Sequence, residues 1–502
     1  MALEASAKEI AMYANGVCSA ISFFVSRPIF RSACQKTDAV IGPILFSLKE
    51  GLTNMSQPQS NGLLERLFHL SEHNTTVRRE CLAGLTTFVS MAYILFVNPI
   101  ILGDAGMDPG AVFTATALSA IMGCLLMGFL ANYPIAIAPG LGDNAFFTYS
   151  IVLAMGMPWQ QAMGGVFIAS ILFTLVSLFK LREIIIDAIP QDLKYAMAAG
   201  IGIFISFVGL QGGGIVMADP SSMVAIGSFK VATTWLTIFG IFVTAMLMAK
   251  KVPGAIFYGI VLTAVLGLVT NLIPLPDSII SMAPSLEPTF GVGVANMGAI
   301  VTDPQMWAVV VIFFLVAFFD TAGTLIGLAQ QAGIMQNGKM PRIGKALMAD
   351  SLSMLGGAVM GTTPTAAYVE SSAGIAVGAR TGLTAIVVAI LFGFSMIFSP
   401  LLSVVTAQVT APALIIIGVL MTSSLREIHW DQFETAFPAF PAFLVIIGMP
   451  LTFNISYGIA FGFLFYPILM TIAGRRKELN PLIWVMFVLF LILLYTLTIL
   501  KF

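Results

Sequence analysis

Residues 135–147 read IAIAPGLGDNAFF, and residues 361–374 read GTTPTAAYVESSAG. In each stretch, an extended piece that contains proline leads into polar residues and then into a stretch that favours helix. Both stretches interrupt apolar segments that could span a membrane. Non-helical backbone is tolerated at membrane depth only where it is buried in protein or lines a cavity. We therefore expect both stretches to be internal and to meet near the middle of a bilayer.

The composition indicates a membrane protein. Of the 502 residues, 58% are hydrophobic and only 9% are charged, whereas soluble domains carry roughly 25% charged residues. The formal net charge of -1 provides no basic field for nucleic acid, so no nucleic-acid partner is expected. The four cysteines and three histidines show no metal-site or redox spacing. We therefore expect no metal and no cofactor, and the lipid bilayer as the surrounding medium.

Apolar segments of spanning length, about 20 residues each, recur along the chain. We predict fourteen spans, near residues 82–102, 111–131, 133–155, 160–179, 195–212, 232–249, 254–272, 306–329, 346–361, 363–379, 382–403, 411–422, 436–450 and 454–473. A last apolar run, 482–500, is either a further crossing or a helix at the membrane interface.

Basic residues cluster in alternate connections, as expected when the cytoplasmic side is rich in Lys and Arg. Arg78 and Arg79 precede the first span, so we place the N-terminus in the cytoplasm. Lys250 and Lys251 then fall on the same side. The connection 273–305 contains no Lys or Arg and falls outside. The sequence thus predicts a multi-pass protein of the cell membrane.

The spans form two groups of seven. Because seven is odd, the second group is inverted relative to the first, which is a common plan of secondary transporters. We expect a first repeat over 81–272, an extracellular connection over 273–305, a second repeat over 306–473 and a C-terminal segment over 474–502, preceded by a cytoplasmic segment over 55–80 and a leader over 1–54. The leader does not match the rest, so we expect it to be dispensable; a regulatory tail is the alternative.

Three acids remain within the predicted spans, Asp143, Asp320 and Glu370. An ionised carboxylate at the bilayer centre costs about 2.5–3.5 kcal/mol, so each needs a reason. Glu370 begins the helical piece after the second break, where unpaired N–H groups can support a carboxylate; a structural helix cap is the alternative. Nothing breaks the helix before Asp320, so capping does not explain it. Asp143 faces either the site or the cytoplasmic vestibule.

Neighbouring side chains suit a heterocyclic base. Asn144 can donate and accept, although a structural hydrogen bond to the broken backbone is the alternative. Phe146 and Phe319 offer ring faces for stacking. A carboxylate accepts two hydrogen bonds side by side, as guanine offers them from N1–H and its 2-amino group. Removing a carboxylate from water disfavours its ionised form, so Glu370, Asp320 and Asp143 are candidates for proton coupling.

Five motifs connect the chain to a known family: RECLAGLTTF (79–88), APGLGDNAFF (138–147), FDTAGTL (319–325), YVESSAG (368–374) and GARTGLT (378–384). In these motifs, and from about Leu64 to Arg476, the chain resembles the nucleobase–cation symporter-2 superfamily, specifically its azaguanine-like purine permease branch.

The resemblance implies an all-α polytopic fold with seven plus seven spans, arranged as core and gate domains. It also implies that the third and tenth spans are broken by short β-strands that pair between the halves. The family's substrate-site acids match Asp320 and Glu370, and its third-span asparagine matches Asn144. Members take adenine, or guanine and hypoxanthine, and residues 362–370 resemble the guanine/hypoxanthine type. We therefore expect purine import by proton symport. The acid at Asp143, where the family often has an apolar residue, leaves coupling or substrate preference open.

Other functions remain as alternatives. A uracil or xanthine transporter could use the same fold, as could an anion transporter, although the latter would favour a cationic or neutral site. Residues 140–143 match the Gly-x-Gly-Asp signature of intramembrane aspartyl proteases, and 412–414 match their Pro-Ala-Leu. The Tyr-Asp span of those proteases is missing, so we expect no enzyme. A receptor or channel is not excluded. The oligomeric state is open, with a homodimer as one option.

Overall fold

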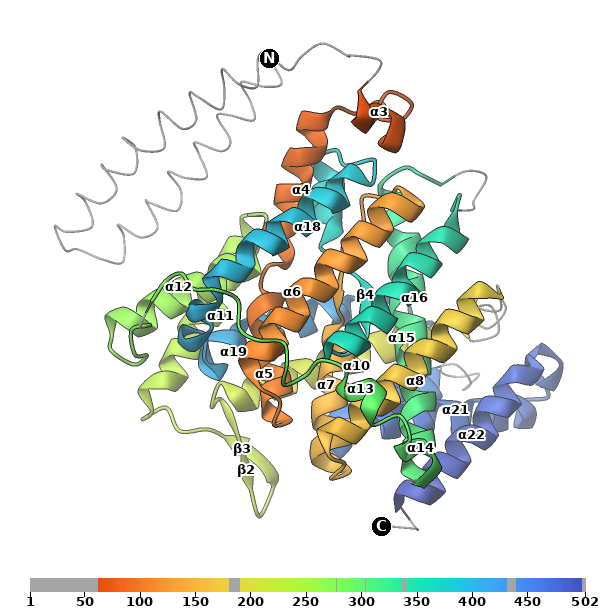
Figure 1. Ribbon diagram of the computed structural model, residues 1–502. Helices are drawn as coiled ribbons and strands as arrows, with labels where there is room; N and C mark the ends of the chain where they lie inside the picture. Colours follow the sequence, from red (N-terminus) through yellow and green to blue (C-terminus); the bar gives the residue numbers. More distant parts are fainter. Residues whose placement is uncertain are drawn as a thin grey trace. The chain divides into compact units, whose positions relative to one another are not determined.

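The computed structural model describes residues 62–179, 190–276, 278–302, 304–335, 340–430 and 439–498 (Figure 1). The chain divides into two units, residues 1–66 and 67–502. The predicted leader lies outside the described residues. The first described helix, α3, covers Leu63–Phe68, and all that follows concerns the second unit.

The first half of this unit contains the elements that precede the long connection. They are α4 (Val77–Met91), α5 (Ile94–Asp104), α6 (Pro109–Leu126), η1 (Met127–Ala131), β1 (Ile137–Pro139), α7 (Leu141–Ala145), η2 (Phe146–Ala154), α8 (Trp159–Leu178), α10 (Gln191–Gly212), β2 (Val216–Asp219), β3 (Met223–Ile226), α11 (Ala232–Ala249) and α12 (Ala255–Val269).

The long connection and the second half follow. They contain α13 (Val292–Ala295), α14 (Ala299–Thr302), α15 (Pro304–Gln331), α16 (Ile343–Met360), β4 (Thr365–Ala367), α17 (Ser371–Val377), α18 (Leu383–Ser395), η3 (Met396–Val404), α19 (Ala407–Met421), η4 (Thr422–Glu427), α20 (Ala439–Thr452), α21 (Ile455–Ile472), η6 (Arg476–Glu478) and α22 (Pro481–Thr498).

Eight helical segments within the described residues are long and apolar enough to cross a membrane. Shorter apolar helices, among them α12 and α20, occupy the places of other predicted spans. The mainly helical membrane fold is thus confirmed, whereas the total of fourteen crossings stays a prediction. Whether α22 crosses the membrane is equally open.

Helix packing repeats between the two halves. When α15, α16, α18, α19, α20 and α21 are matched in order with α4, α6, α8, α10, α11 and α12, each main contact has a counterpart. For example, α16 packs on α8 as α6 packs on α18, and α10 packs on α20 as α19 packs on α11. Figure 1 shows α6, α16 and α8 side by side. This duplication is what an inverted repeat requires.

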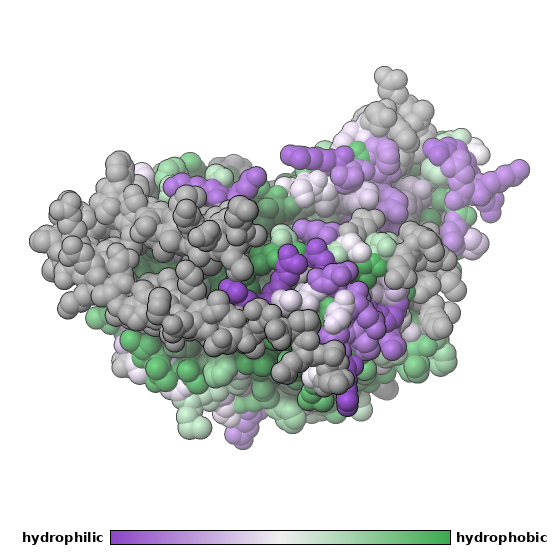
Figure 2. All heavy atoms as spheres, turned by 90° about the horizontal axis from the view of Figure 1, so that it is seen from above, coloured by the Kyte–Doolittle hydropathy of each residue, from purple (hydrophilic) through white to green (hydrophobic). Residues whose placement is uncertain are grey.

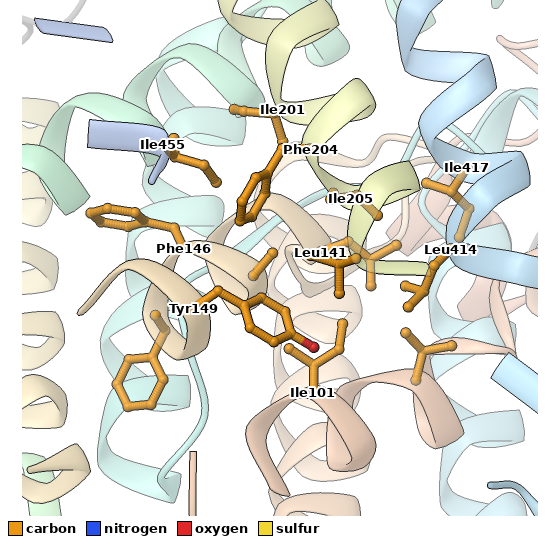
Figure 3. Close-up of a cluster of buried hydrophobic side chains, with 14 of the residues drawn as sticks. Ile101, Leu141, Phe146, Tyr149, Ile201, Phe204, Ile205, Leu414, Ile417 and Ile455 are labelled. Atoms are coloured by element: carbon orange, nitrogen blue, oxygen red, sulfur yellow. The ribbon is translucent and has the colours of Figure 1, made fainter. Parts of the chain in front are cut away.

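The packing also separates two groups of helices, which we call the core and the gate. The core contains α4 to α8 and α15 to α18, and the gate contains α10 to α12 and α19 to α21; contacts are extensive within each group and sparse between them. Figure 3 shows buried side chains where the groups meet, namely Ile201, Phe204 and Ile205 of α10, Leu414 and Ile417 of α19, and Leu141 and Tyr149 of the core.

Apolar side chains on the outer helices are exposed. Phe242 on α11 and Phe394 on α18 are 61% and 65% exposed. Hydrophilic residues gather instead on the end of the molecule that is shown from above in Figure 2. Arg79 in the first turn of α4, Arg342 just before α16 and Lys345 in the first turn of α16 are exposed. This division is that of a protein whose sides face lipid.

A hairpin of mainly apolar strands with a polar turn, β2–β3, connects α10 to α11 and projects beyond the helices in Figure 1. Its turn is organised by Asp219, whose Oδ1 accepts hydrogen bonds from the backbone N–H groups of Ser221 and Ser222 at 2.8 and 2.9 Å. The hydroxyl of Ser221, followed by these N–H groups, lowers the pKa of Asp219 to about 2. The turn therefore keeps its charge at all ordinary pH values.

Candidate substrate site

The two interrupted stretches meet as a short antiparallel strand pair. β1 pairs with β4 in a register that places Ile137 opposite Ala367 and Pro139 opposite Thr365. All residues of both strands are buried. Proline accounts for the break in each, because it lacks an N–H and disfavours helix for the residue before it. The predicted strand pairing between the halves is thus confirmed.

Glu370 lies at the start of α17, directly after β4. It occupies the N-cap position, yet its side chain makes no capping hydrogen bond. Instead, the hydroxyl of Tyr93 donates to its Oε1 at 2.5 Å. The structural-cap alternative is therefore not what the geometry shows, and the carboxylate is directed towards the first span.

Tyr93 is a partner of the candidate residue Glu370 that the sequence did not reveal. It lies between α4 and α5, where the first span is interrupted, and it is 1% exposed. The surrounding residues 90–95, SMAYIL, contain neither Gly nor Pro. The available signal was a hydroxyl-bearing ring within a predicted span.

The backbone around Glu370 is anchored to β1. The hydroxyl of Tyr368 donates to the carbonyl of Pro139 at 2.6 Å. The Ser371 hydroxyl accepts from the N–H of Ala136 at 3.0 Å. Residues on both sides of Glu370 are thus held to the other broken span, which fixes the position of the backbone from which the Glu370 side chain extends.

Asn144 lies in α7, the short helix after β1, and is fully buried. The hydroxyl of Thr363 donates to its Oδ1. Among the described residues, its Nδ2 has no hydrogen-bond partner. Buried amide groups are normally satisfied, so this side chain stabilises the broken region and retains a donor for a ligand.

A second buried amide, that of Asn98, contacts the same segment of the chain as Asn144. Asn98 of α5 donates from Nδ2 to the hydroxyl oxygens of Thr116 and Thr362, at 2.7 and 3.1 Å. Thr362 precedes Thr363, the partner of Asn144. Buried amide and hydroxyl groups from α5, α6 and α7 therefore converge on the segment that leads into β4.

The remaining predicted residues are distributed as follows. Asp143 is fully buried in the first turn of α7. Phe146 is buried in η2, and its ring centroid lies 4.9 Å from that of Phe313 in an edge-on arrangement. Phe146 therefore packs the third span against α15. The side chains of Phe319 and Asp320 lie outside the described part. Their helix, α15, packs against α7, β4 and α17.

Comparisons with known proteins agree with this architecture. The model of the permease family (Xan_ur_permease) matches residues 78–461. The guanine/hypoxanthine permease PbuG of Bacillus subtilis is 53% identical over 438 residues, which cover 86% of this chain and 99% of that protein. The adenine permease AdeP of Escherichia coli is 41% identical, over 87% of this chain and 97% of that protein.

A solved structure shares the fold. The transmembrane domain of the cyanobacterial bicarbonate transporter BicA superposes with a TM-score of 0.57 at 16% identity, covering 77% of this chain and 97% of that one. These matches are to transporters, and none supports the protease alternative suggested by residues 140–143. The chain is a transporter rather than an enzyme, and it belongs to the permease family of nucleobase–cation symporters that its motifs resemble.

Proposed function

We propose that this chain imports purine nucleobases across the cell membrane by proton symport, with guanine and hypoxanthine as favoured substrates and adenine as the second candidate. The support for the purine class is the extent of the similarity to PbuG, which spans 99% of that permease. Adenine stays in the proposal because AdeP is 41% identical over a similar length.

The position of Glu370 is the structural observation that carries the proposal. Its carboxylate stands at the N-terminal end of α17, where α15 and the strand pair come together. Position 320 follows Phe313 by seven residues, nearly two turns of an α-helix, so it shares the helix face on which Phe313 meets Phe146. We therefore propose that Asp320 and Glu370 line one pocket with Asn144, and that Phe146 and Phe319 border it.

Proton coupling follows from the same acids. A carboxylic acid in a site closed off from water is neutral more readily than one in water, so one acid of the site can carry the proton while a neighbouring ionised acid accepts the N–H donors of the base. Proton binding and purine binding at Glu370 or Asp320, with Asp143 as a third candidate, are therefore linked. Movement of the core against the gate would expose this site alternately to the two sides.

The proposed setting is the cell membrane with the N-terminus in the cytoplasm. It is supported by the exposed basic residues Arg79, Lys250 and Lys345, which the predicted crossings place on one side. For the oligomeric state, a homodimer is one of two alternatives, and a monomer is the other. Cross-linking in intact membranes would distinguish it from a monomer.

Uptake of labelled hypoxanthine, in cells that lack their own purine permeases, tests the function. We expect uptake that is abolished by a protonophore and is competed by guanine more strongly than by adenine, xanthine or uracil. Xanthine or uracil as the strongest competitor would favour the alternative substrate class. Bicarbonate or sulfate transport without purine uptake would favour an anion transporter.

The substitution Asp320→Asn should weaken hypoxanthine uptake or its dependence on protons. Normal proton-dependent uptake by this variant would show that Asp320 is not part of the site.

A further inference from the structure

We propose that Tyr93 is a positioning residue for the substrate-site carboxylate: by donating its phenolic hydrogen bond to Glu370, it orients that side chain and sets the pH range in which transport operates. The inference rests on the proposed function and extends it to a residue of the first span, for which no role follows from the five motifs.

The break in the first span puts Tyr93 in place. α4 ends at Met91 and α5 begins at Ile94, and the intervening Ala92 and Tyr93 keep right-handed helical dihedral angles, so the helix is locally distorted rather than ended. The carbonyls of both turn residues still accept hydrogen bonds, from the N–H groups of Leu95 and Val97 at 3.2 and 3.0 Å. The backbone at Ala92 and Tyr93 is therefore hydrogen-bonded, and the ring of Tyr93 is buried.

Close packing brings the two spans together. A Cβ placed on Gly374 of α17 would lie 2.1 Å from the Thr87 hydroxyl oxygen and 2.7 Å from the Ala83 carbonyl, both on α4. α17 thus rests directly on α4, which ends two residues before Tyr93. With the backbone of α17 anchored to β1 as well, the distance from the phenol to Glu370 is determined by rigid elements rather than by a mobile loop.

The chemistry of the bond is directional. A phenol donates one hydrogen, and hydrogen bonds to an ionised carboxylate are shorter and stronger than those between neutral groups. The 2.5 Å separation of Tyr93 Oη and Glu370 Oε1 fits such a bond. Tyr93 therefore favours the ionised acid, which is the form that accepts hydrogen bonds from a purine, and it fixes the rotation of the carboxylate.

The elements around α17 also carry other charged or titratable groups. Arg79 lies at the opposite end of α17, where its Nε would be 2.5 Å from a Cβ on Gly378. Glu80 is engaged at that end by the N–H groups of Arg380 and Thr381. Tyr368 donates to Pro139, and Asp320 lies on α15. Tyr93 is thus a group with a direct hydrogen bond to the Glu370 carboxylate, at 2.5 Å.

The test compares Tyr93→Phe with the wild type in hypoxanthine uptake measured across external pH. Loss of a hydrogen bond to a charged group, about 1.5–3 kcal/mol, should let Glu370 hold its proton to higher pH. We expect the midpoint of the pH profile to move to alkaline values by about one unit, and KM to rise by about tenfold. An unchanged midpoint together with an unchanged KM would overturn the inference.

Two further measurements separate positioning from general damage. Tyr149→Phe removes a phenol that donates to a different carboxylate, Asp104, at 2.9 Å, and it should leave the pH midpoint where it is. A fluorinated tyrosine at position 93 keeps the packing and donates more strongly, so the midpoint should move to acid values. A shift in the same direction as Tyr93→Phe would contradict the proposal. Absence of purine uptake by the wild type would contradict the proposed function, whereas the pH midpoints of these variants test only the role of Tyr93.

Discussion

Three carboxylates in this chain are each held by a different set of donors. Glu370 accepts from Tyr93, and Asp104 accepts from Tyr149. Glu80, which is fully buried in the first turn of α4, accepts from the N–H groups of Arg380 and Thr381 at 2.9 and 3.3 Å and from the Thr384 hydroxyl at 2.5 Å. It therefore ties the start of the first span to the loop between α17 and α18.

Replacing Glu80 with Ala would leave these three donors without their acceptor. Because bonds to a charged group contribute about 1.5–3 kcal/mol each and are not additive, we expect a loss of roughly 3–5 kcal/mol. A drop of several degrees in the melting temperature of the detergent-solubilised protein would show it. Glu478→Ala is the matched control, since Glu478 pairs with Arg475 at the exposed surface, where an ion pair contributes about 0–1 kcal/mol. Equal melting temperatures for both variants would refute this role of Glu80.

Residue-level prediction from the sequence singled out positions where polarity was unusual. Glu370 and Asn144 stood out because they follow prolines in apolar segments, and the structure places both beside the strand pair. Glu80 and Tyr93 were missed. Glu80 follows two arginines, so no local pattern marks it as buried, and its partners lie about 300 positions away in the sequence. Such contacts depend on which helices pack together, which no local pattern specifies.

Among the secondary-structure elements, the short half-helix α17 depends on a close approach to α4. Gly374 permits it, because any Cβ there would overlap Thr87 and the backbone of Ala83. Gly374→Ala should push α17 away from α4 and separate Glu370 from Tyr93. We expect hypoxanthine uptake to fall by at least about tenfold, at normal amounts of protein in the membrane.

A glycine in open space provides the control for this prediction. A Cβ on Gly327 of α15 would have no atom within 4 Å, and alanine favours helix over glycine by roughly 1 kcal/mol. Gly327→Ala should therefore transport normally. Wild-type uptake by Gly374→Ala would mean that the position of α17 does not depend on this contact.

Elements were predictable from sequence where composition changes sharply. Proline and glycine marked the breaks at β1 and β4, and the alternation of apolar and polar segments located the spans to within a few residues. The break between α4 and α5 was not predicted, because Ala92 and Tyr93 carry no helix-breaking signal. The register of β1 on β4 could not be predicted either, since small apolar residues on both strands would fit more than one alignment.

For the molecule as a whole, transport requires the core to move against the gate. One contact between them is an aromatic cluster formed by Tyr149 of η2, Phe204 of α10 and Phe453, which precedes α21. Their ring centroids lie 5.4–6.3 Å apart. Beside it, the Ser150 hydroxyl accepts from the N–H of Ile455 at 3.1 Å. These contacts join the core to the gate, and we expect them to favour closure of the two groups at this point.

Phe453→Ala should weaken that closure, because each aromatic pair contributes about 0.5–1.5 kcal/mol beyond its buried area. A cysteine introduced at the buried position 455 reports the opening. We expect an impermeant maleimide to label it about tenfold faster in the Phe453→Ala background. The same labelling rate with and without Phe453 would show that the cluster does not hold the core against the gate.

At the scale of the whole molecule, the sequence predicted the repeat but not how the chain meets the bilayer or other copies. The two-fold repeat followed from counting spans, since charge alternation constrains that count. The dispensable leader, residues 1–54, remains a prediction, as do the crossing of α22 and the homodimer. They depend on how the chain meets the bilayer and its neighbours, which local residue patterns do not determine.

The most direct test of the central claim is purine accumulation by the purified protein in liposomes under an imposed pH gradient. With the proton-rich side matched to the entry side, the wild type should concentrate hypoxanthine, and collapse of the gradient should stop it. Glu370→Gln, which keeps the shape but cannot lose a proton, should insert normally and accumulate none. Accumulation by Glu370→Gln at the wild-type rate would contradict the account.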